Sequence, residues 1–229
     1  MKLAIMQPYL FPYLGYFQLI HSVDSFVIYD DVNYIKGGWI NRNFILTQGN
    51  KHLITLPLKG ASQNQLINQI TVGDRQDKVI KTICQCYSKA PQFSNVFPLI
   101  EEALLQQEKN LACFLNFELH LLCNYLELHP QWHISSALKK DNTLRGTEKV
   151  LAICAELKAT HYINLPGGKE LYDQESFAQM GLKLSFIQPR PVSYGQFKNQ
   201  FVPNLSIIDV MMFNDREQCE RLLKEYDFV

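Results

Sequence analysis

The sequence has no surplus of charge of either sign, no long apolar run and no cysteine pair with Cys-x-x-Cys spacing. Its 22 Lys and Arg residues equal its 22 Asp and Glu residues in number, so no overall field attracts nucleic acid or an anionic membrane. No apolar run approaches the roughly 20 residues that cross a bilayer, and no secretory signal is recognised. We therefore expect a cytoplasmic protein without a nucleic-acid partner or a membrane span. A local basic pocket is still compatible with this composition.

The six cysteines do not form a recognisable metal or disulfide pattern. Cys84 and Cys86 are two residues apart, which places them on different faces of a helix and departs from the Cys-x-x-Cys spacing of zinc and redox sites. The others are scattered through apolar, helix-like stretches. We expect reduced thiols, no disulfide and no structural metal.

Composition and length favour one folded domain over residues 1–229. Apolar residues make up 47% of the chain and charged residues 19%, which supplies a core and gives no sign of disorder. Chains of this length regularly form one α/β core. No repeat, linker or low-complexity tract interrupts the sequence.

Hydrophobic periodicity predicts strands separated by helices. Short apolar or β-branched runs predict strands at Lys2–Met6, Ser25–Tyr29, Trp132–Ser135, Thr160–Leu165 and Leu182–Ile187. Helical patterns cover Tyr16–Val23, Thr143–Leu157 and Asp215–Tyr226, and a helical insertion covers about 74–128, broken at Pro91 and Pro98. Ile40–Leu46 and His52–Leu58 predict a hairpin. The fold class is α/β, with a mainly parallel, doubly wound sheet, a helical insertion and a C-terminal extension.

The segment from Gln7 to Gln18 is the first candidate for ligand binding. It places Tyr13 and Tyr16 around Gly15, where a helix begins after the first strand. Free amides at a helix N-terminus and a glycine that permits close approach suit a phosphate or carboxylate. In the alternative, these aromatic side chains only close the top of the core.

The segment from Tyr29 to Asn43 follows the second strand and is the more telling one. Asp30 and Asp31 leave the strand on opposite sides, so at most one of them enters a pocket at the strand end. Lys36 and Arg42 can bind phosphate oxygens, and we expect both to converge with Asp31 in one cleft at the C-terminal end of the first two strands. Three further side chains share one face by their spacing of two and can stack and hydrogen-bond a base or sugar: Trp39, Asn41 and Asn43. The alternative is a solvated hairpin with ordinary ion pairs.

Single residues elsewhere carry weaker hypotheses. His21 can act as a general base, although an isolated histidine beside an apolar face is more often structural, as His161 within a strand is. Asp209 is interpreted as a helix cap rather than a pocket residue. Gly167 and Gly168 follow a strand and can form either a backbone anion site or a plain tight turn.

The sequence resembles the WbqC-like proteins along nearly its whole length. The motifs are Met6-Gln-Pro-Tyr-Leu-Phe-Pro-Tyr-Leu-Gly-Tyr-Phe-Gln-Leu-Ile20, Phe26-Val-Ile-Tyr-Asp-Asp31, Lys36-Gly-Gly-Trp-Ile-Asn-Arg-Asn43, Tyr162-Ile-Asn-Leu-Pro-Gly-Gly168, Tyr194-Gly-Gln196 and Asn204-Leu-Ser-Ile-Ile-Asp209. The resemblance implies a role in bacterial surface-polysaccharide (O-antigen, lipopolysaccharide) synthesis and attachment of glycine or a similar acyl group to an amino sugar.

A fainter resemblance links the chain to the nucleotidylyltransferase-like α/β superfamily. Tyr13-Leu-Gly-Tyr16 is similar in position to the His-x-Gly-His signature of that superfamily, with tyrosine in place of both histidines. Ile134-Ser-Ser136 followed by Arg145 is similar to its second phosphate-binding region. Tyrosine cannot supply imidazolium charge, so the likeness concerns the fold more than nucleotidyl transfer.

Two functions follow from these observations. The first is an N-acyltransferase that forms an amide on a nucleotide-linked amino sugar. In it Asp31 or Asp30 acts as base, with His21 as second choice. Lys36, Arg42 and Arg145 grip the diphosphate, and Trp39 and Tyr16 stack the ring. The acyl donor is either a thioester on an acyl carrier protein or an adenylate made with ATP. The second is a non-catalytic protein that binds the same nucleotide sugar, because no nucleophile-base pair is visible.

Overall fold

The structure, a computed structural model, describes residues 1–198 and 200–229. Its centre is a sheet of six strands in the order β10-β9-β8-β1-β2-β7. The strands are β1 (Lys2–Met6), β2 (Ser25–Ile28), β7 (Gln131–Ile134), β8 (His161–Asn164), β9 (Lys183–Pro189) and β10 (Tyr226–Phe228). The first five run parallel and β10 is antiparallel to β9. The α/β class and the mainly parallel sheet are therefore confirmed.

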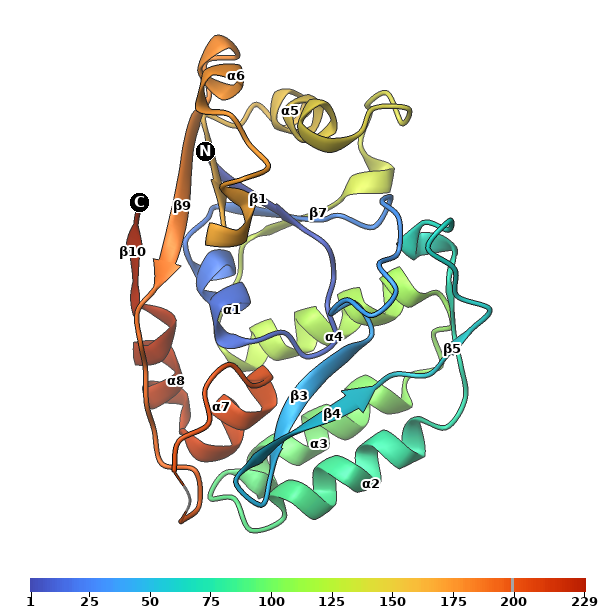
Figure 1. Cartoon of the computed structure of the whole chain (residues 1–229), viewed down its shortest axis with the longest axis vertical. Helices are drawn as coiled ribbons and strands as arrows, with labels where there is room; N and C mark the ends of the chain where they lie inside the picture. The colour runs from blue at the N-terminus through green and yellow to red at the C-terminus, as the bar shows by residue number, and fades with distance from the viewer. Residues whose placement is uncertain (199) are drawn as a thin grey trace.

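Helices cover both faces of this sheet, as Figure 1 shows. The helices are α1 (Leu14–His21), α2 (Gln76–Tyr87), α3 (Phe93–Leu105), α4 (Leu111–Tyr125), α5 (Gly146–Glu156), α6 (Gln174–Gln179), α7 (Ile207–Phe213) and α8 (Arg216–Leu223). Successive residues of a strand point to opposite faces, and β1 follows this rule. Leu3 and Ile5 pack with α5 and α6, whereas Ala4 packs in the larger cluster with α1 and α4.

The remaining strands form two short antiparallel ribbons beside the sheet. They are β3 (Arg42–Thr47) with β4 (Asn50–Thr55), and β5 (Leu58–Lys59) with β6 (Thr71–Val72). The β3-β4 hairpin is the one that the sequence predicts, although β3 begins later along the chain than expected and β4 begins earlier. Short 3-10 turns complete the set: η1 (Ile67–Gln69), η2 (Ser135–Ala137) and η3 (Pro166–Gly168).

Two details of the predicted elements are wrong. Pro98 does not break a helix but lies inside α3, where the burial of Val96 and Ile100 outweighs the one backbone hydrogen bond that a proline forfeits. The terminal helix ends at Leu223, and the chain then forms β10 on the edge of the sheet. A strand this short leaves no periodicity signal, so only pairing with β9 reveals it.

The strand order reverses between β1 and β8, and this reversal creates a crevice. From β1 the chain builds outward through β2 and β7 on one side and through β8 and β9 on the other. Pairing across the reversal joins Lys2 with His161 and Leu3 with Tyr162, at the start of each strand. The strands therefore part toward their carboxyl ends. Open α/β sheets bind their ligands at such a point.

Candidate functional site

Two cavities, each of about 620 Å³, open at the edge of the sheet where the parallel strands end. The switch-point cavity lies where β1 and β8 part and is lined by residues 5–7, 164, 165, 167 and 168 together with aromatic side chains. The α5 cavity lies beside it, between residues that follow β2 and β7 and the first turn of α5. Tyr29, directly after β2, lines both cavities. The two cavities therefore adjoin.

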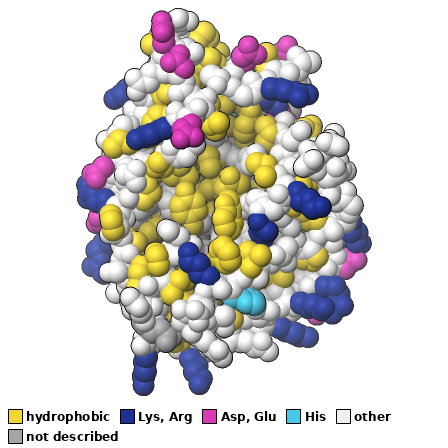
Figure 2. Space-filling view, in the orientation of Figure 1, with side chains coloured by type: hydrophobic (Ala, Val, Ile, Leu, Met, Phe, Trp, Pro, Cys, Tyr) yellow, Lys and Arg dark blue, Asp and Glu magenta, His cyan; other side chains and the backbone are white. Residues whose placement is uncertain are grey.

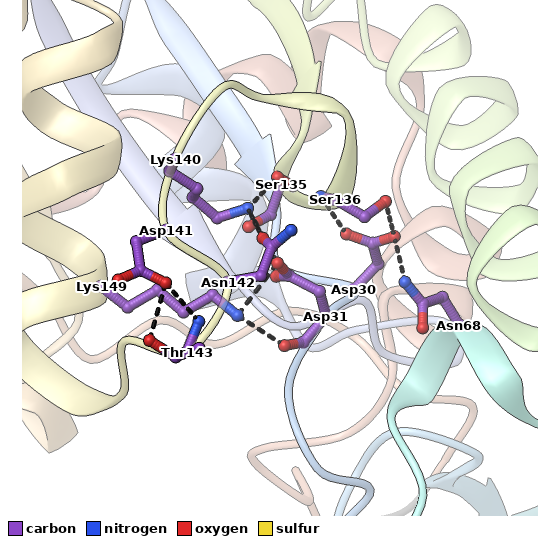
Figure 3. A network of polar contacts seen from close by, with 10 residues as sticks. All are labelled: Asp30, Asp31, Asn68, Ser135, Ser136, Lys140, Asp141, Asn142, Thr143 and Lys149. Carbon is purple, nitrogen blue, oxygen red and sulfur yellow. Dashed lines mark hydrogen bonds and ion pairs between the residues drawn. The ribbon is translucent and has the colours of Figure 1, made fainter.

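Asp31 is held between two buried lysines in the α5 cavity. Its Oδ2 atom lies 2.8 Å from Lys140 Nζ and 2.9 Å from Lys149 Nζ, and the three side chains are 7%, 1% and 5% exposed. Lys149 Nζ also donates to the Asp31 carbonyl at 2.7 Å, and Lys140 donates to the Ser135 carbonyl. Figure 3 shows both ammonium groups pointing at the same carboxylate.

Burial of the Asp31 carboxyl raises its pKa, but the adjacent ammonium groups of Lys140 and Lys149 outweigh that effect and lower the pKa below its ordinary value. Asp31 is therefore a carboxylate at neutral pH. A carboxylate with a lowered pKa is a weak base, since general-base efficiency is greatest when the pKa lies near the working pH. The geometry favours a role in fixing the two lysines over the expected role in taking up a proton.

Asp30 is also buried but makes a different set of contacts. Its carboxylate accepts hydrogen bonds from Ser136 N at 2.9 Å, from Ser136 Oγ at 2.6 Å and from Asn68 Nδ2 at 3.1 Å. These donors come from η2 and η1, which belong to distant parts of the chain (Figure 3). Asp30 thus ties the end of β2 to Ser136 and Asn68, two residues that line the α5 cavity. Asp31, not Asp30, lines the α5 cavity.

The first turn of α5 faces the α5 cavity with positive charge. Arg145 is the N-cap residue, Gly146 follows it, and Lys149 lies one turn further; all three line the cavity. Within the described residues, no side chain caps this turn. Cations at the positive end of a helix dipole are unfavourable unless an anion offsets them. Asp31 supplies one negative charge to this group, and a bound phosphate would supply more.

The switch-point cavity is aromatic and largely apolar. Its aromatic lining consists of Tyr9, Tyr13, Tyr29, Trp39 and Tyr172. Three apolar residues stand at its rim with unusually large exposure: Leu171 at 68%, Ile35 at 53% and Trp39 at 46%. Figure 2 shows a hollow lined by hydrophobic side chains on the molecular face, with Lys and Arg side chains around its margin. Such a cavity suits a flat or ring-shaped group that carries negative charge on an adjoining part.

Burial raises the pKa of Tyr13 to about 12, with the nearby Tyr9 hydroxyl adding to the effect. Burial also raises the pKa of Tyr29, helped by the Asp31 charge. Both phenols therefore remain protonated at physiological pH. They can donate a hydrogen bond to a ligand oxygen but cannot act as bases there.

Gly168 makes room for Asn164 at the end of β8. A Cβ atom on Gly168 would lie 2.8 Å from Asn164 Nδ2, whereas one on Gly167 would meet nothing within 4 Å. Asn164 in turn accepts from Leu165 N at 2.7 Å and donates to the Tyr162 hydroxyl at 3.1 Å. The two glycines are therefore not equivalent, although the sequence treats them alike.

We expect Gly168→Ala to lower the free energy of unfolding by roughly 1–3 kcal/mol, because the added methyl group must displace Asn164 from its hydrogen bonds. Gly167→Ala is the matched control and should change stability by less than about 0.5 kcal/mol. Urea denaturation of the three proteins measures both values. Equal losses in the two variants would contradict this account of Gly168.

Three other predicted residues do not line a cavity but pack or form hydrogen bonds near the site. Tyr16 is fully buried, donates to the Gln7 carbonyl at 2.9 Å and packs in the core, so it cannot stack a ligand as expected. Gly15 leaves room for the Tyr13 ring, since a Cβ atom there would lie 2.5 Å from that ring. Asn41 accepts from the Tyr34 hydroxyl at 2.8 Å. Tyr16 and Gly15 therefore shape the loop that carries Gln7 and Tyr13, whereas Asn41 joins Tyr34 to the Leu56 carbonyl.

Three of the predicted site residues line neither cavity in the part of the chain that the structure describes. Lys36 is exposed, and Arg42 Nε donates to the Gly38 carbonyl at 3.0 Å instead of entering a cavity. The expected convergence of Lys36, Arg42 and Asp31 in one cleft is therefore wrong. His21 ends α1 and lies 3.1 Å from the Tyr226 hydroxyl. Because α1 runs back along the sheet, its last residue sits at the opposite edge from the cavities.

Neither Lys140 nor Lys149 is among the site residues predicted from the sequence, although Lys149 leaves a signal there. Lys149 precedes Ile153 by four residues and so lies on the apolar face of the predicted helix, where a charge requires a partner. Lys140 lies in a loop without such a pattern.

Asp209 is not the helix cap that the sequence predicts. Ser206 is the cap of α7, and Asp209 lies buried in the first turn of that helix. Its carboxylate accepts hydrogen bonds from the Tyr87 hydroxyl at 2.9 Å and the Tyr194 hydroxyl at 2.7 Å. Asp209 therefore joins distant segments inside the core rather than ending a helix.

The described residues contain no group of three or more His, Cys, Asp or Glu side chains placed to hold a metal ion. None of the helices in that same part of the chain combines the length and apolarity needed to cross a membrane. All six cysteines are free thiols.

The fold and the cavities define an α/β protein with two adjoining cavities at the carboxyl-terminal edge of a mainly parallel sheet. The chain belongs to the WbqC-like protein family, whose model matches residues 7–221. It is 29% identical over 222 residues to the uncharacterized protein Rv1507c of Mycobacterium tuberculosis (strain ATCC 25618 / H37Rv), covering 93% of each chain. No solved structure matches it significantly.

Proposed function

We propose that this protein binds a nucleotide-linked amino sugar across the two adjoining cavities and transfers a small acyl or aminoacyl group to its amine, in bacterial surface-polysaccharide synthesis. The observation that supports this most strongly is the contrast between the cavities. The α5 cavity lies at the start of a helix and carries positive charge, whereas the switch-point cavity is lined by aromatic side chains. Tyr29 lines both cavities. A nucleotide sugar has two matching kinds of group: an anionic diphosphate for the cationic cavity, and a flat base and a sugar ring for the aromatic one.

The α5 cavity suits the diphosphate. Arg145 can donate two parallel hydrogen bonds to phosphate oxygens. The first residues of α5, which no side chain among the described residues caps, line the same cavity, and free amides at a helix start suit an anion. Lys149 is buried, and Asp31 fixes its position. A positive group that is held in place stabilises an anion without the entropy cost of ordering a flexible side chain on binding.

The switch-point cavity suits the base or the sugar ring. Trp39 at the rim and Tyr13 deeper in the cavity offer aromatic faces. Gln7, directly after β1, and the backbone at Gly167 add polar groups to an otherwise apolar lining. A few polar groups in an aromatic cavity fix the orientation of a ligand that stacking alone would leave free.

The reaction joins the amine nitrogen to the acyl carbon and expels the thiol of a carrier or the AMP of an acyl-adenylate, while the amine loses a proton. Amines on carbons next to C–O bonds are weaker bases than a lysine side chain, so a fraction is neutral near physiological pH. A protein base is then not obligatory. This agrees with the ion pairing of Asp31 and the distance of His21 from the site. The proposal therefore gives catalysis chiefly to positioning and to cationic stabilisation of the developing oxyanion.

The test is incubation of the protein with nucleotide amino sugars and acyl donors, followed by mass spectrometry of the sugar. One arm supplies a carrier-bound acyl or glycyl thioester, and a second arm supplies the free acid with ATP. We expect a mass gain equal to the acyl group in one arm, which also identifies the donor. Arg145→Ala, assayed beside the wild type, should lose most of the gain at low sugar concentration.

The second candidate is a non-catalytic protein that binds the same nucleotide sugar and serves another enzyme. One observation favours it: the carboxylate in the α5 cavity is engaged by lysines and is not free to act on a substrate. Under this candidate, nucleotide amino sugars raise the melting temperature while no donor produces a mass gain. That result would overturn the transferase proposal and retain the binding site.

A further inference from the structure

Phe11 has a backbone conformation that a residue with a side chain rarely adopts. Its φ angle is +42°, in the left-handed region, although it is not glycine and is fully buried. It lies in the loop between β1 and α1, between Tyr9 and Tyr13, the two tyrosines that this loop contributes to the switch-point cavity. Non-glycine residues persist in such conformations only where their surroundings over-determine them, and they cluster at functional sites.

Side chains from three distant elements hold the Phe11 backbone. Glu118 of α4 accepts a hydrogen bond from Phe11 N at 2.5 Å through Oε1. The Phe11 carbonyl accepts one from Asn43 Nδ2 of β3 at 2.7 Å and another from Ser206 Oγ, before α7, at 2.8 Å. Both backbone polar groups of Phe11 are thus satisfied by side chains that are remote in the sequence.

Backbone groups just before β3 and at the start of α7 also fix the residues on either side of Phe11. Leu10 N donates to the Ile40 carbonyl at 3.0 Å, and Ile207 N donates to the Pro12 carbonyl at 2.7 Å. Tyr13 forms an isolated bridge with Ser206. The loop therefore cannot turn at Phe11 without breaking contacts on every side. The directions in which Tyr9 and Tyr13 leave the loop are set by these contacts.

Glu118 is the most unusual of the three. It is fully buried, and within the described residues its Oε2 atom has no hydrogen-bond partner and no cation forms an ion pair with it. Burial raises its pKa well above the ordinary value, against the smaller opposing effect of the Phe11 N–H. The ionised form of Glu118 is therefore disfavoured in the folded protein. Burying a carboxyl group that has only one hydrogen bond lowers the stability of the fold, so a residue with a purely structural role would be apolar at this position.

We propose that Glu118, Asn43 and Ser206 are positioning residues of the switch-point cavity: they hold Phe11 in its left-handed conformation and so direct Tyr9 and Tyr13 into the ligand space. The inference rests on the proposed function only for the nature of the ligand. Asn43 of β3 also lines the switch-point cavity, as the sequence predicts, so it both shapes the loop and borders the ligand space.

The test follows the tyrosines directly and needs no ligand. The full chain is labelled with 3-fluorotyrosine, and the fluorine resonances of Tyr9 and Tyr13 are assigned with Tyr9→Phe and Tyr13→Phe. Glu118→Leu, which removes the acceptor, should displace or broaden both resonances. Glu118→Gln keeps an acceptor oxygen on a neutral side chain of the same shape, and it should leave both resonances near their wild-type positions.

Two controls separate positioning from general loss of stability. Leu122→Ala removes a fully buried side chain one turn further along α4, and it should lower stability without moving the two resonances. If Glu118→Leu does not fold, Ser206→Ala serves instead, with Asp215→Ala as the control for a lost helix cap, since Asp215 caps α8.

The proposal is overturned if Glu118→Leu, or Ser206→Ala in its place, leaves the resonances of Tyr9 and Tyr13 unchanged. It is also overturned if the control variants displace them equally. Titration of the folded variants with a nucleotide amino sugar is a separate readout. A weakening of about tenfold or more in Glu118→Leu, absent in Glu118→Gln, is expected. Failure of any such sugar to bind the wild type would count against the proposed function and not against the resonance result.

Discussion

Replacing Asp31 by Asn is expected to lower the free energy of unfolding by about 3–5 kcal/mol, the range found when one partner of a buried ion pair is removed. The neutral amide introduced by Asp31→Asn would leave the ammonium groups of Lys140 and Lys149 buried without a counter-charge. Neither lysine can reach solvent without breaking its hydrogen bond to a backbone carbonyl. Urea denaturation at pH 7 measures the loss.

The control for this variant is Asp74→Asn. Asp74 also contacts two lysines, Lys59 at 2.7 Å and Lys109 at 3.7 Å, but all three side chains are more than half exposed. Exposed pairs contribute about 0–1 kcal/mol. Similar losses in Asp31→Asn and Asp74→Asn would show that the Asp31 contacts contribute no more than a surface pair does.

The Asp31 effect also has a predicted pH dependence. Its folded-state pKa lies below the ordinary value of 3.8. Stability from its ionised form is therefore fully present above that ordinary value and is lost as the pH falls through the lower folded-state pKa. The stability difference between wild type and Asp31→Asn should be constant above about pH 5 and shrink below it. A difference that grows on acidification would contradict the direction of this pKa.

Replacing Arg145 by Ala is expected to weaken the binding of a nucleotide amino sugar about ten- to hundredfold. A hydrogen bond between charged groups contributes about 1.5–3 kcal/mol, and each 1.4 kcal/mol or so is a factor of about ten in affinity. Because Arg145 is exposed and makes no ion pair among the described residues, the free energy of unfolding should change by less than about 0.5 kcal/mol. Calorimetric titration of both proteins gives the ratio.

Arg145→Lys distinguishes charge from shape, since lysine keeps the charge but lacks the planar fork of arginine. Arg42→Ala is the matched control, because Arg42 is an arginine outside the lining of both cavities. It should bind the sugar as the wild type does. If Arg42→Ala weakens binding and Arg145→Ala does not, the diphosphate lies on the hairpin side and the α5 cavity is not its site.

Local patterns predict the parallel sheet well because buried strands leave a signal in a few consecutive residues. The apolar runs at β1 and β2 end where polar or proline residues follow, and both strands appear close to the expected bounds. The elements that the sequence did not predict depend on distant partners. β10 exists only through pairing with β9, and Pro98 remains helical only because α3 packs on its neighbours.

The site residues also fall into those that local patterns predict and those that depend on distant contacts. Asp31 and Gly168 follow strand ends directly, so the parallel sheet brings them to one edge whatever the loops do. Lys36 and Arg42 lie further along a loop whose course depends on contacts with other segments, and the expectation that they join Asp31 is wrong for that reason. Lys149 is identifiable as a charge on an apolar helix face, but its partner cannot be inferred from that pattern.

The most direct measurement is a crystal structure of the protein soaked with a nucleotide amino sugar. The account predicts diphosphate oxygens beside Arg145 and the first-turn amides of α5, and a ring of the ligand in the switch-point cavity against Trp39 or Tyr13. Density for the ligand elsewhere on the molecule, or both cavities unoccupied at a ligand concentration that saturates binding in solution, would contradict it.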